Sequence, residues 1–368
     1  MRRVIVPLLF LFALPLLAQK NDDEVLDQIF AIKTIHKTAI APNGKSVAWS
    51  VEGSGLFVDG KNLSTKAEEF GWSPDSKRLA YIAEKQLYVV TPGTAAKKLT
   101  SVKGFLADPQ WSPDGKSIAF VFIENAAREA GPLAAMSRAI GEIASHIEEQ
   151  RVAIVDVASG KLRIVTPDDT YVYEYDWSPD GTQLAMIAAQ GSGDDNWWIA
   201  QMYTVDIAAA KMTAVYKPEL QIASPRWSPD GKRIAFIEGL MSDQGVTGGD
   251  LFVIDVANPQ PRNLTPSAPF SAGSLRWSGK DDITFGANMA GDAAIAIVPA
   301  SGGDPEIVYR APEYITTGDV AGASFSNDGA QSAVIRSSFA QPPEVWAGKT
   351  GAWKQVSHVN ANVTARVG

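Results

Sequence analysis

The phrase W-S-P-D-G-K-x-I-A-F recurs along this chain of 368 residues. Clear copies begin at Trp72, Trp111, Trp177 and Trp227, and weaker copies begin at Ala41, Trp277 and Phe325. A phrase that returns in this way indicates a repeat architecture, in which every copy contributes one similar structural unit. The chain is therefore predicted to consist of seven such units.

Each copy predicts a β-hairpin. Proline presets φ for a turn, aspartate bonds to the turn backbone, and glycine adopts the positive φ that precedes the next strand. Alternating apolar runs follow, as at 151–156, 202–206 and 251–255, and a last short run such as 161–166 completes the unit. Four short antiparallel strands per unit are typical of a propeller blade. We therefore predict an all-β, seven-bladed β-propeller of four-stranded antiparallel blades.

The residues that define the phrase are assigned to structure rather than to ligand binding. Five of the ten tryptophans stand at the start of a copy, and an aromatic ring that recurs in every unit is expected to pack between neighbouring blades. The aspartates are expected to be turn residues. The structural repeat residues are Trp72, Asp75, Trp111, Asp114, Trp177, Asp180, Trp227 and Asp230.

Three insertions interrupt the repeat. The longest spans 124–150, where a Gly-Pro breaker precedes apolar residues spaced like one face of a helix. Shorter insertions occupy 190–198 and 239–249. All three fall between the predicted second and third strands, whose connections emerge on the same face as the links between blades. The helix is expected either to pack on the propeller or to face a partner domain or a substrate entrance.

Acidic and aromatic residues collect on this predicted rim, and loops on a rigid scaffold commonly carry function. Together they are suited to hold a cation such as the amino terminus of a peptide. The alternative is a solvated acidic loop with two half-buried tryptophans. The candidate substrate-binding residues are Glu148, Glu149, Asp194, Asp195, Trp197 and Trp198.

The first residues resemble a secretory signal. Arg2 and Arg3 precede an unbroken apolar run at 4–17, which is short for a membrane span. Residues 1–18 are predicted to be a signal peptide, so the protein is expected in the bacterial periplasm or outside the cell. Leu16 stands where a cleavage site prefers a small residue, which leaves an uncleaved anchor as an alternative. No later stretch predicts a membrane span.

The repeated phrases resemble the N-terminal propeller of the prolyl oligopeptidase family of serine peptidases, in its acylaminoacyl-peptidase and dipeptidyl-peptidase branches. They are also similar to the TolB propeller. Pro343-Glu344-Val345-Trp346 and the segment 353–360 resemble the last blade of the peptidase branch, which leads into a hydrolase domain. The resemblance implies a lead-in at 19–35, a propeller at 36–360, and a truncated linker to an absent α/β-hydrolase domain at 361–368.

The peptidase family carries its serine nucleophile on a G-x-S-x-G elbow, followed by aspartate and histidine. This chain contains no G-x-S-x-G, and its three histidines, His36, His146 and His358, are expected to be surface or packing residues. No catalytic residue is assigned. No metal or cofactor motif is present, the chain has no cysteine, and the net charge of −8 argues against a nucleic-acid partner.

The predicted function is that of a noncatalytic propeller of an exported serine peptidase, which gates access and binds peptide substrates. Its partners are then a peptide or protein and an α/β-hydrolase domain. A TolB-like periplasmic propeller that binds proteins is the first alternative. The second is a propeller enzyme whose own carboxylates act across the ring axis.

Overall fold

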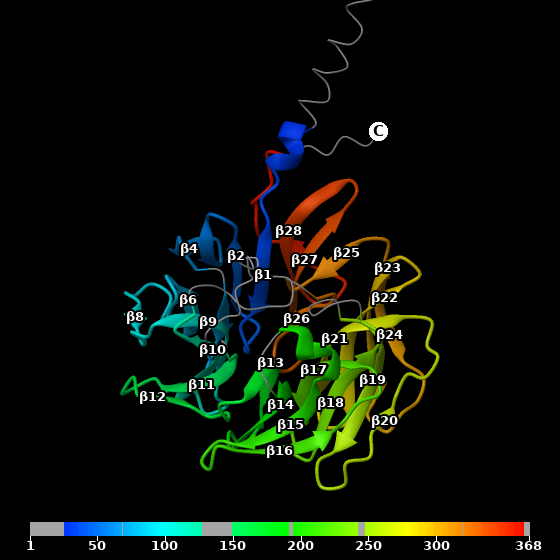
Figure 1. Ribbon diagram of the computed structural model, residues 1–368. Helices are drawn as coiled ribbons and strands as arrows, with labels where there is room; N and C mark the ends of the chain where they lie inside the picture. The colour runs from blue at the N-terminus through cyan, green and yellow to red at the C-terminus, as the bar shows by residue number, and fades with distance from the viewer. Residues whose placement is uncertain are drawn as a thin grey trace, which may run out of the picture.

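The computed structural model describes residues 26–67, 69–126, 149–190, 194–241, 247–318 and 320–363. For residues 194 and 195 it describes the backbone alone. Seven antiparallel sheets are arranged as blades around a common axis (Figure 1). Six sheets have four strands in sequence order, and the seventh has five because its first strand is split. The predicted all-β, seven-bladed propeller is confirmed. The predicted helix of the 124–150 insertion falls largely at 127–148, outside the described residues.

The strands follow one another blade by blade. Blades 1 and 2 contain β1 (Ile35–Ile40), β2 (Val47–Val51), β3 (Gly55–Val58), β4 (Lys61–Ser64), β5 (Phe70–Trp72), β6 (Leu79–Ala83), β7 (Gln86–Val90) and β8 (Lys97–Lys98). Blades 3 and 4 contain β9 (Gly104–Trp111), β10 (Ser117–Glu124), β11 (Arg151–Asp156), β12 (Leu162–Ile164), β13 (Thr170–Trp177), β14 (Gln183–Gln190), β15 (Gln201–Asp206) and β16 (Lys211–Tyr216). The 3-10 helix η1 (Asp194–Ile199) lies between β14 and β15.

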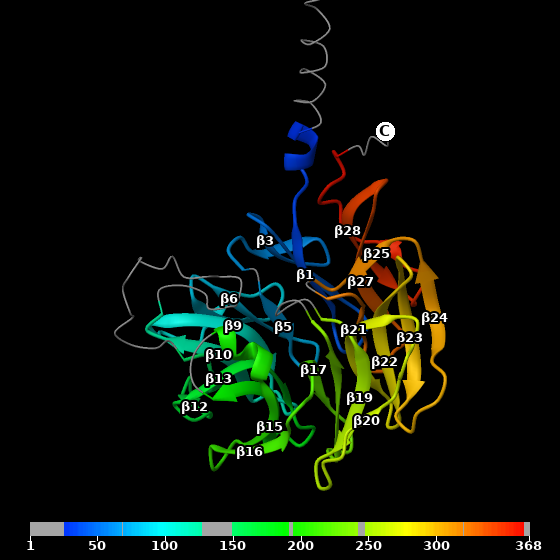
Figure 2. The same ribbon diagram turned by 45° about the vertical axis from the view of Figure 1, so that its right-hand side comes forward.

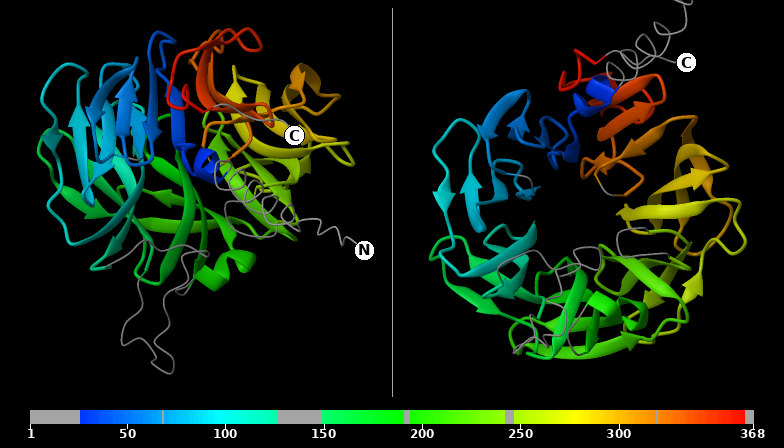
Figure 3. Two further views of the ribbon diagram at one scale, coloured as in Figure 1. Left: turned by 90° about the horizontal axis from the view of Figure 1, so that it is seen from above. Right: turned by 45° about the horizontal axis from the view of Figure 1, so that its top comes forward.

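Blade 5 contains β17 (Gln221–Trp227), β18 (Arg233–Gly239), β19 (Asp250–Asp255) and β20 (Arg262–Asn263). Blade 6 contains β21 (Ser271–Ser278), β22 (Asp282–Met289), β23 (Asp292–Pro299) and β24 (Glu306–Ala311). Blade 7 contains β25 (Tyr314–Thr316), β26 (Ser324–Phe325), β27 (Ser332–Ser338), β28 (Gln341–Gly348) and β29 (Lys354–Gln355). The first strands of neighbouring blades contact each other, which places them nearest the axis (Figure 3).

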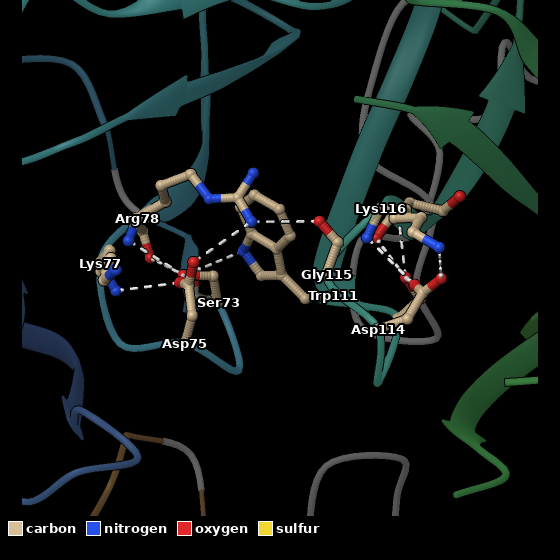
Figure 4. Close-up of polar contacts among 11 residues, drawn as sticks. Ser73, Asp75, Lys77, Arg78, Trp111, Asp114, Gly115 and Lys116 are labelled. Carbon is tan, nitrogen blue, oxygen red and sulfur yellow. Dashed lines mark hydrogen bonds and ion pairs between the residues drawn. The ribbon is translucent and has the colours of Figure 1, made fainter. Parts of the chain in front are cut away.

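The repeated phrase forms the hairpin between the first and second strands of a blade. In blade 3, Ser112 Oγ donates to Asp114 Oδ1 (2.7 Å), and the Lys116 N–H donates to the same oxygen (3.0 Å; Figure 4). Gly115 closes the turn with φ of 68°. Blade 2 has Ser76 at this position with φ of 61°, and its hydroxyl accepts the Asn43 N–H of blade 1 (3.0 Å). These bonds fix where each blade reverses.

The tryptophan that starts the phrase joins its blade to the preceding one. Its indole N–H donates to a backbone carbonyl in the first strand of the preceding blade. That carbonyl belongs to the residue just before the tryptophan position of the preceding blade. The four bonds are Trp72 to Ala39 (3.1 Å), Trp111 to Gly71 (3.1 Å), Trp177 to Gln110 (3.3 Å) and Trp277 to Arg226 (3.0 Å). In blade 5 the contact differs, because Asp176 Oδ2 accepts the backbone N–H of Trp227 (2.8 Å).

Arginines reinforce two of these junctions from the start of the second strand. Arg78 lies over the Trp111 ring (4.5 Å to its centroid) and donates to Gly115 O (3.1 Å; Figure 4). Arg233 lies in the same way over Trp277 (4.9 Å). Partly buried guanidinium–aromatic contacts of this kind are favourable. The turns and the contacts between blades therefore reinforce each other.

Blades 1 and 7 close the ring without sharing a strand. The Thr38 N–H donates to Thr317 O (2.8 Å), and the Ile40 N–H donates to Ser324 Oγ (3.1 Å). An apolar cluster that includes Trp49 and Val345 spans the junction. The closure therefore depends on side-chain packing and on a few single hydrogen bonds.

A clasp around Asn360 completes this closure. Asn360 Oδ1 accepts the Lys33 N–H (2.8 Å), while Nδ2 donates to Lys33 O (3.1 Å) and Pro343 O (2.8 Å). Glu344, which is buried, accepts the N–H groups of Val359 (3.0 Å) and Asn360 (2.7 Å). The clasp holds the lead-in and the C-terminal segment side by side where both leave the ring (Figures 1 and 2).

Candidate functional site

The connections between second and third strands lie on the same face as the links between blades. Gly249 O, at the end of the 239–249 connection, accepts the Ala272 N–H of the next blade (3.0 Å). Gln86 makes the same kind of contact in blade 2, since its side chain bonds to Val102 in the link to blade 3. We call this the link face. The three insertions start and end on it.

The structure describes part of the predicted rim site. Glu148 lies outside the described residues, and so do the side chains of Asp194 and Asp195, whose backbone forms the start of η1. Trp197 is 3% exposed and belongs to the core of blades 4 and 5, whereas Trp198 is 47% exposed and meets it edge to face at 5.0 Å. Of these two rings, Trp198 is the one that faces solvent.

Glu149 lies at the base of the longest insertion in a mixed charge environment. Burial raises the pKa of its carboxyl, and the Asp169 charge raises this pKa further, while the Arg151 charge opposes both. Arg151 itself pairs with Asp168 (2.6 Å). Glu149 Oε2 is buried and makes no hydrogen bond within the described residues. In the described part of the rim, this oxygen therefore has no protein partner.

A second set of polar residues lies on the first strands near the axis, at fixed offsets from the repeated phrase. We call these the inner-ring residues. Three residues before the tryptophan position lie Lys37, Glu69, Asp108, Glu174, Ser224 and Ser274, and one residue before it lie Gln110, Asp176, Arg226, Arg276 and Ser324. Sequence reasoning missed this set, although the constant offset was a signal that could have found it.

The inner-ring carboxylates form an acidic wall on blades 2 to 4. Glu69 accepts the Asp108 N–H, and Glu174 Oε2 accepts the Ser224 N–H of the next blade (2.8 Å). Register irregularities interrupt the first strand at these positions, and a bulge leaves an N–H free for such a bond. Burial raises the pKa of Glu174 and raises that of Asp176 to about 6, against the opposing charge of Arg226. A pKa of about 6 leaves Asp176 partly protonated in mildly acidic solution.

A cavity of about 330 Å³ lies between blades 5, 6 and 7. Arg226, Arg276, Ser274 and Ser324 contribute polar groups to its lining. Leu275, Phe285, Ile295 and Phe325 also line it. Within the described residues, no group of His, Asp and Glu side chains could hold a metal ion, and no helix is long and apolar enough to cross a membrane.

Residues 52–314 match the model of the Lipoprotein LpqB beta-propeller domain. The chain belongs to this family. It is a LpqB-type propeller whose matched region begins within blade 1 and ends at the start of blade 7.

Two curated relatives of this LpqB-type propeller are peptidases. Dipeptidyl-peptidase 5 of Porphyromonas gingivalis is 27% identical over 147 residues, which cover 35% of this chain and 19% of the relative. The uncharacterized peptidase YuxL of Bacillus subtilis is 33% identical over 119 residues, which cover 25% of this chain and 18% of the relative. The matched segments thus span less than a fifth of either peptidase.

Solved structures share the fold of this LpqB-type propeller. Acylaminoacyl peptidase of Pyrococcus horikoshii has a TM-score of 0.63 at 12% identity, over 90% of this chain and 54% of that one. The β-propeller domain of the Trilobed protease from Pyrococcus furiosus, described as having an open velcro topology, has a TM-score of 0.62 at 13% identity, over 89% and 98%. A putative TolB from Agrobacterium tumefaciens has a TM-score of 0.51 at 17% identity, over 86% and 98%. The expected resemblance to peptidase and TolB propellers is confirmed.

Proposed function

We propose that this chain is the noncatalytic, substrate-binding propeller of an exported serine peptidase of the prolyl oligopeptidase type. In this proposal it gates the approach of peptides to a separate α/β-hydrolase domain. The proposed export rests on the predicted signal at 1–18. It agrees with the match to the lipoprotein propeller family and with the similarity to TolB propellers, both of which are associated with the cell envelope. The peptidase relatives support the assignment, although they match over a limited part of their length.

One observation carries the proposal: apolar side chains are exposed on the link face. Phe30 of the lead-in is 82% exposed, and Phe339 in the β27–β28 turn is fully exposed. Blades 4 and 5 add four more such residues: Trp198, Ile199, Leu220 and Leu240. Figures 1 and 2 show the lead-in and the β27–β28 hairpin at the same end of the molecule. Clustered exposed apolar groups mark interaction surfaces, so this face is suited to carry a second domain.

The same face also supports the gating role. The acidic rim around Glu149 and the exposed ring of Trp198 lie where a domain seated on the link face would meet its substrate. A peptide amino terminus would be attracted by the carboxylates and by the aromatic ring. Glu148, Asp194 and Asp195 belong to this proposed rim site by their position in the sequence.

A protein-binding role of the TolB kind is the second candidate. The observation that favours it is again the exposed apolar face, because a separate envelope protein would cover it as well as a hydrolase domain would. The two candidates differ in whether the assembly hydrolyses peptides.

Immunodepletion from cells that make the protein tests these candidates. Removing the chain from an envelope extract should remove a peptide-hydrolysing activity that fluorophosphonate inhibits, and the captured material should contain a reactive serine hydrolase. The control is antibody blocked beforehand with the recombinant chain. Capture of envelope proteins with no loss of activity would favour the TolB-like role and refute the peptidase role.

A further inference from the structure

A second cavity, of about 400 Å³, lies where the outer strand of blade 1 meets the middle strands of blade 2. Residues of β4 line one side of it, and residues of β6 and β7 line the other (Figure 1). Gly55 permits the path of the chain here, since a Cβ at this position would lie 1.9 Å from Ser64 O. The end of β4 can therefore lie close against β3, and the chain leaves blade 1 along the edge of the cavity.

Two stacked tyrosines form the closed end of the cavity. Tyr81 and Tyr88 are cross-strand neighbours on β6 and β7, and their rings are nearly parallel, with centroids 5.3 Å apart. Tyr81 is 5% exposed and Tyr88 is half-buried. Burial raises the pKa of the Tyr81 hydroxyl, against the opposing effect of a hydrogen bond with Ser64. The Tyr81 hydroxyl therefore keeps its proton at neutral pH and can donate it in a hydrogen bond.

An ion pair marks the open end. Lys66 and Glu84 both line the cavity and form a salt bridge, and their side chains are 63% and 57% exposed. Glu84 lies in the tight turn between β6 and β7, where it has φ of 50°, a conformation that residues other than glycine seldom adopt. Exposed ion pairs contribute little stability, so both charged groups can exchange part of their contact for a ligand at small cost.

Asn62 supplies an oriented amide from β4. Its Nδ2 donates to Ser54 O (2.8 Å) in the turn between β2 and β3, and this bond assigns the amide so that Oδ1 is the acceptor. Leu63 and Ala83 contribute apolar groups to the same lining. The cavity thus combines an amide oxygen, phenol hydroxyls and small apolar contacts within one enclosure.

This combination favours a sugar that carries an acetamido group. Polar groups reach the cavity from three strands and a link, which matches a ring with a polar group on nearly every carbon. An amino-acid side chain concentrates its polar atoms at one end and would use only part of this lining. The Asn62 oxygen is suited to accept an acetamido N–H, a tyrosine hydroxyl to donate to its carbonyl, and Ala83 to contact its methyl group. The volume lies within the range of small-ligand pockets.

We propose that this cavity binds an N-acetylated amino sugar. The acetamido group would lie between Asn62 and the tyrosine hydroxyls, and Lys66 and Glu84 would bond to ring hydroxyls at the mouth. The proposal rests on these side chains alone and does not depend on the peptidase role, so either can fail without the other.

Titration of the full chain with matched glycosides, followed by saturation-transfer NMR and calorimetry, tests this site. The probes are methyl N-acetyl-β-glucosaminide and methyl β-glucoside, which differ in the acetamido group. The glucosaminide should bind at least about 10-fold more tightly, as expected for one further hydrogen bond and one buried methyl group. Equal affinities, or no saturation transfer to the glucosaminide, would overturn the proposal.

Two variants locate the binding. Tyr88→Phe removes one hydroxyl but keeps the ring stack, and Asn62→Ala removes the acceptor amide. Each should weaken glucosaminide binding by about 5-fold or more, and Asn62→Ala should leave glucoside binding nearly unchanged. Tyr314→Phe and Asn258→Ala are the matched controls, because both residues are exposed and lie on blades 7 and 5. Thermal unfolding of each variant establishes that it is folded.

A third probe separates a sugar site from a general amide site. N-acetylglycine N-methylamide has the acetamido group on a peptide-like backbone without a sugar ring. If it binds as tightly as the glucosaminide, the ring is not recognised and the sugar assignment is overturned. Folded Tyr88→Phe and Asn62→Ala variants that bind the glucosaminide as the parent chain does would place its binding elsewhere and would overturn the proposal as well.

Discussion

The Asn360 clasp gives the most quantitative prediction, because ring closure without a shared strand leaves blades 1 and 7 dependent on it. The Asn360→Ala substitution removes three hydrogen bonds, two with Lys33 and one with Pro343. Asn360 is only 2% exposed, whereas the backbone groups that it bonds are partly buried and can in part be solvated after its loss. At about 1 kcal/mol for each bond, the free energy of unfolding should fall by about 3 kcal/mol.

Urea unfolding followed by tryptophan fluorescence measures this change, and amide hydrogen exchange in β1 locates it. Lys33 to Ile40 should exchange faster in the variant, because the clasp holds the start of this strand. His358→Ala is the control, since His358 is exposed and, among the described residues, its side chain makes one weak contact, at 3.4 Å, with Gln355. A loss for Asn360→Ala no larger than about 0.5 kcal/mol, the range of ordinary surface substitutions, would refute the account of ring closure.

Three further predictions concern the inner ring and the repeated turn. The pKa of Asp176 is raised to about 6 from an ordinary 3.8, so the folded state holds this proton more tightly and the carboxyl costs stability as pH rises from about 4 to 6. Between pH 4 and pH 8, the free energy of unfolding of Asp176→Asn should therefore rise by on the order of 2 kcal/mol relative to that of the parent chain, as measured by urea unfolding. Parallel plots of unfolding free energy against pH for the two proteins would contradict this. Hydrogen bonds from Ser112 and Lys116 lower the pKa of Asp114, so the stability that its carboxylate contributes is present above pH 4 and is lost as pH falls through the lowered pKa. Asp114→Ala should therefore reduce the free energy of unfolding by about 1 kcal/mol at pH 7 and by little at pH 2. An equal reduction at both pH values would count against the turn assignment. Arg78→Met should lower the free energy of unfolding by about 1 to 2 kcal/mol and change tryptophan fluorescence, because it removes the contact with the Trp111 ring and the hydrogen bond to Gly115 O. An unchanged emission spectrum would show that the contact with Trp111 does not form in solution.

The fold could be predicted from the sequence because most blades repeat the same turn chemistry. The Ser-Pro-Asp-Gly segment places a proline, a bonding carboxylate and a positive φ at fixed positions, and this pattern alone identifies where a first strand ends. Blade 7 was less predictable. Its weak copy at Phe325 marked the turn correctly, but nothing in the local pattern indicated that the preceding strand would be split around 317–323.

The candidate site was predictable only in part. The alternation Glu174-Tyr175-Asp176-Trp177 already separates polar from aromatic residues, and the structure buries both aromatic rings. Which blades contribute to one cavity depends on the closure of the ring, and a single sequence does not contain that information. Trp197 and Trp198 show the same limit, because adjacent rings in one loop differ in burial only through the packing of η1 against blade 5.

The intact mass of the native protein after reaction with fluorophosphonate tests the central claim most directly. If the chain serves a serine peptidase, the species isolated from its own cells will carry the label, either on one polypeptide larger than 39.3 kDa by a whole domain or on a tightly bound hydrolase subunit. An unlabelled species a little below 39.3 kDa, with no labelled partner, would contradict the claim and leave a propeller that works by binding alone.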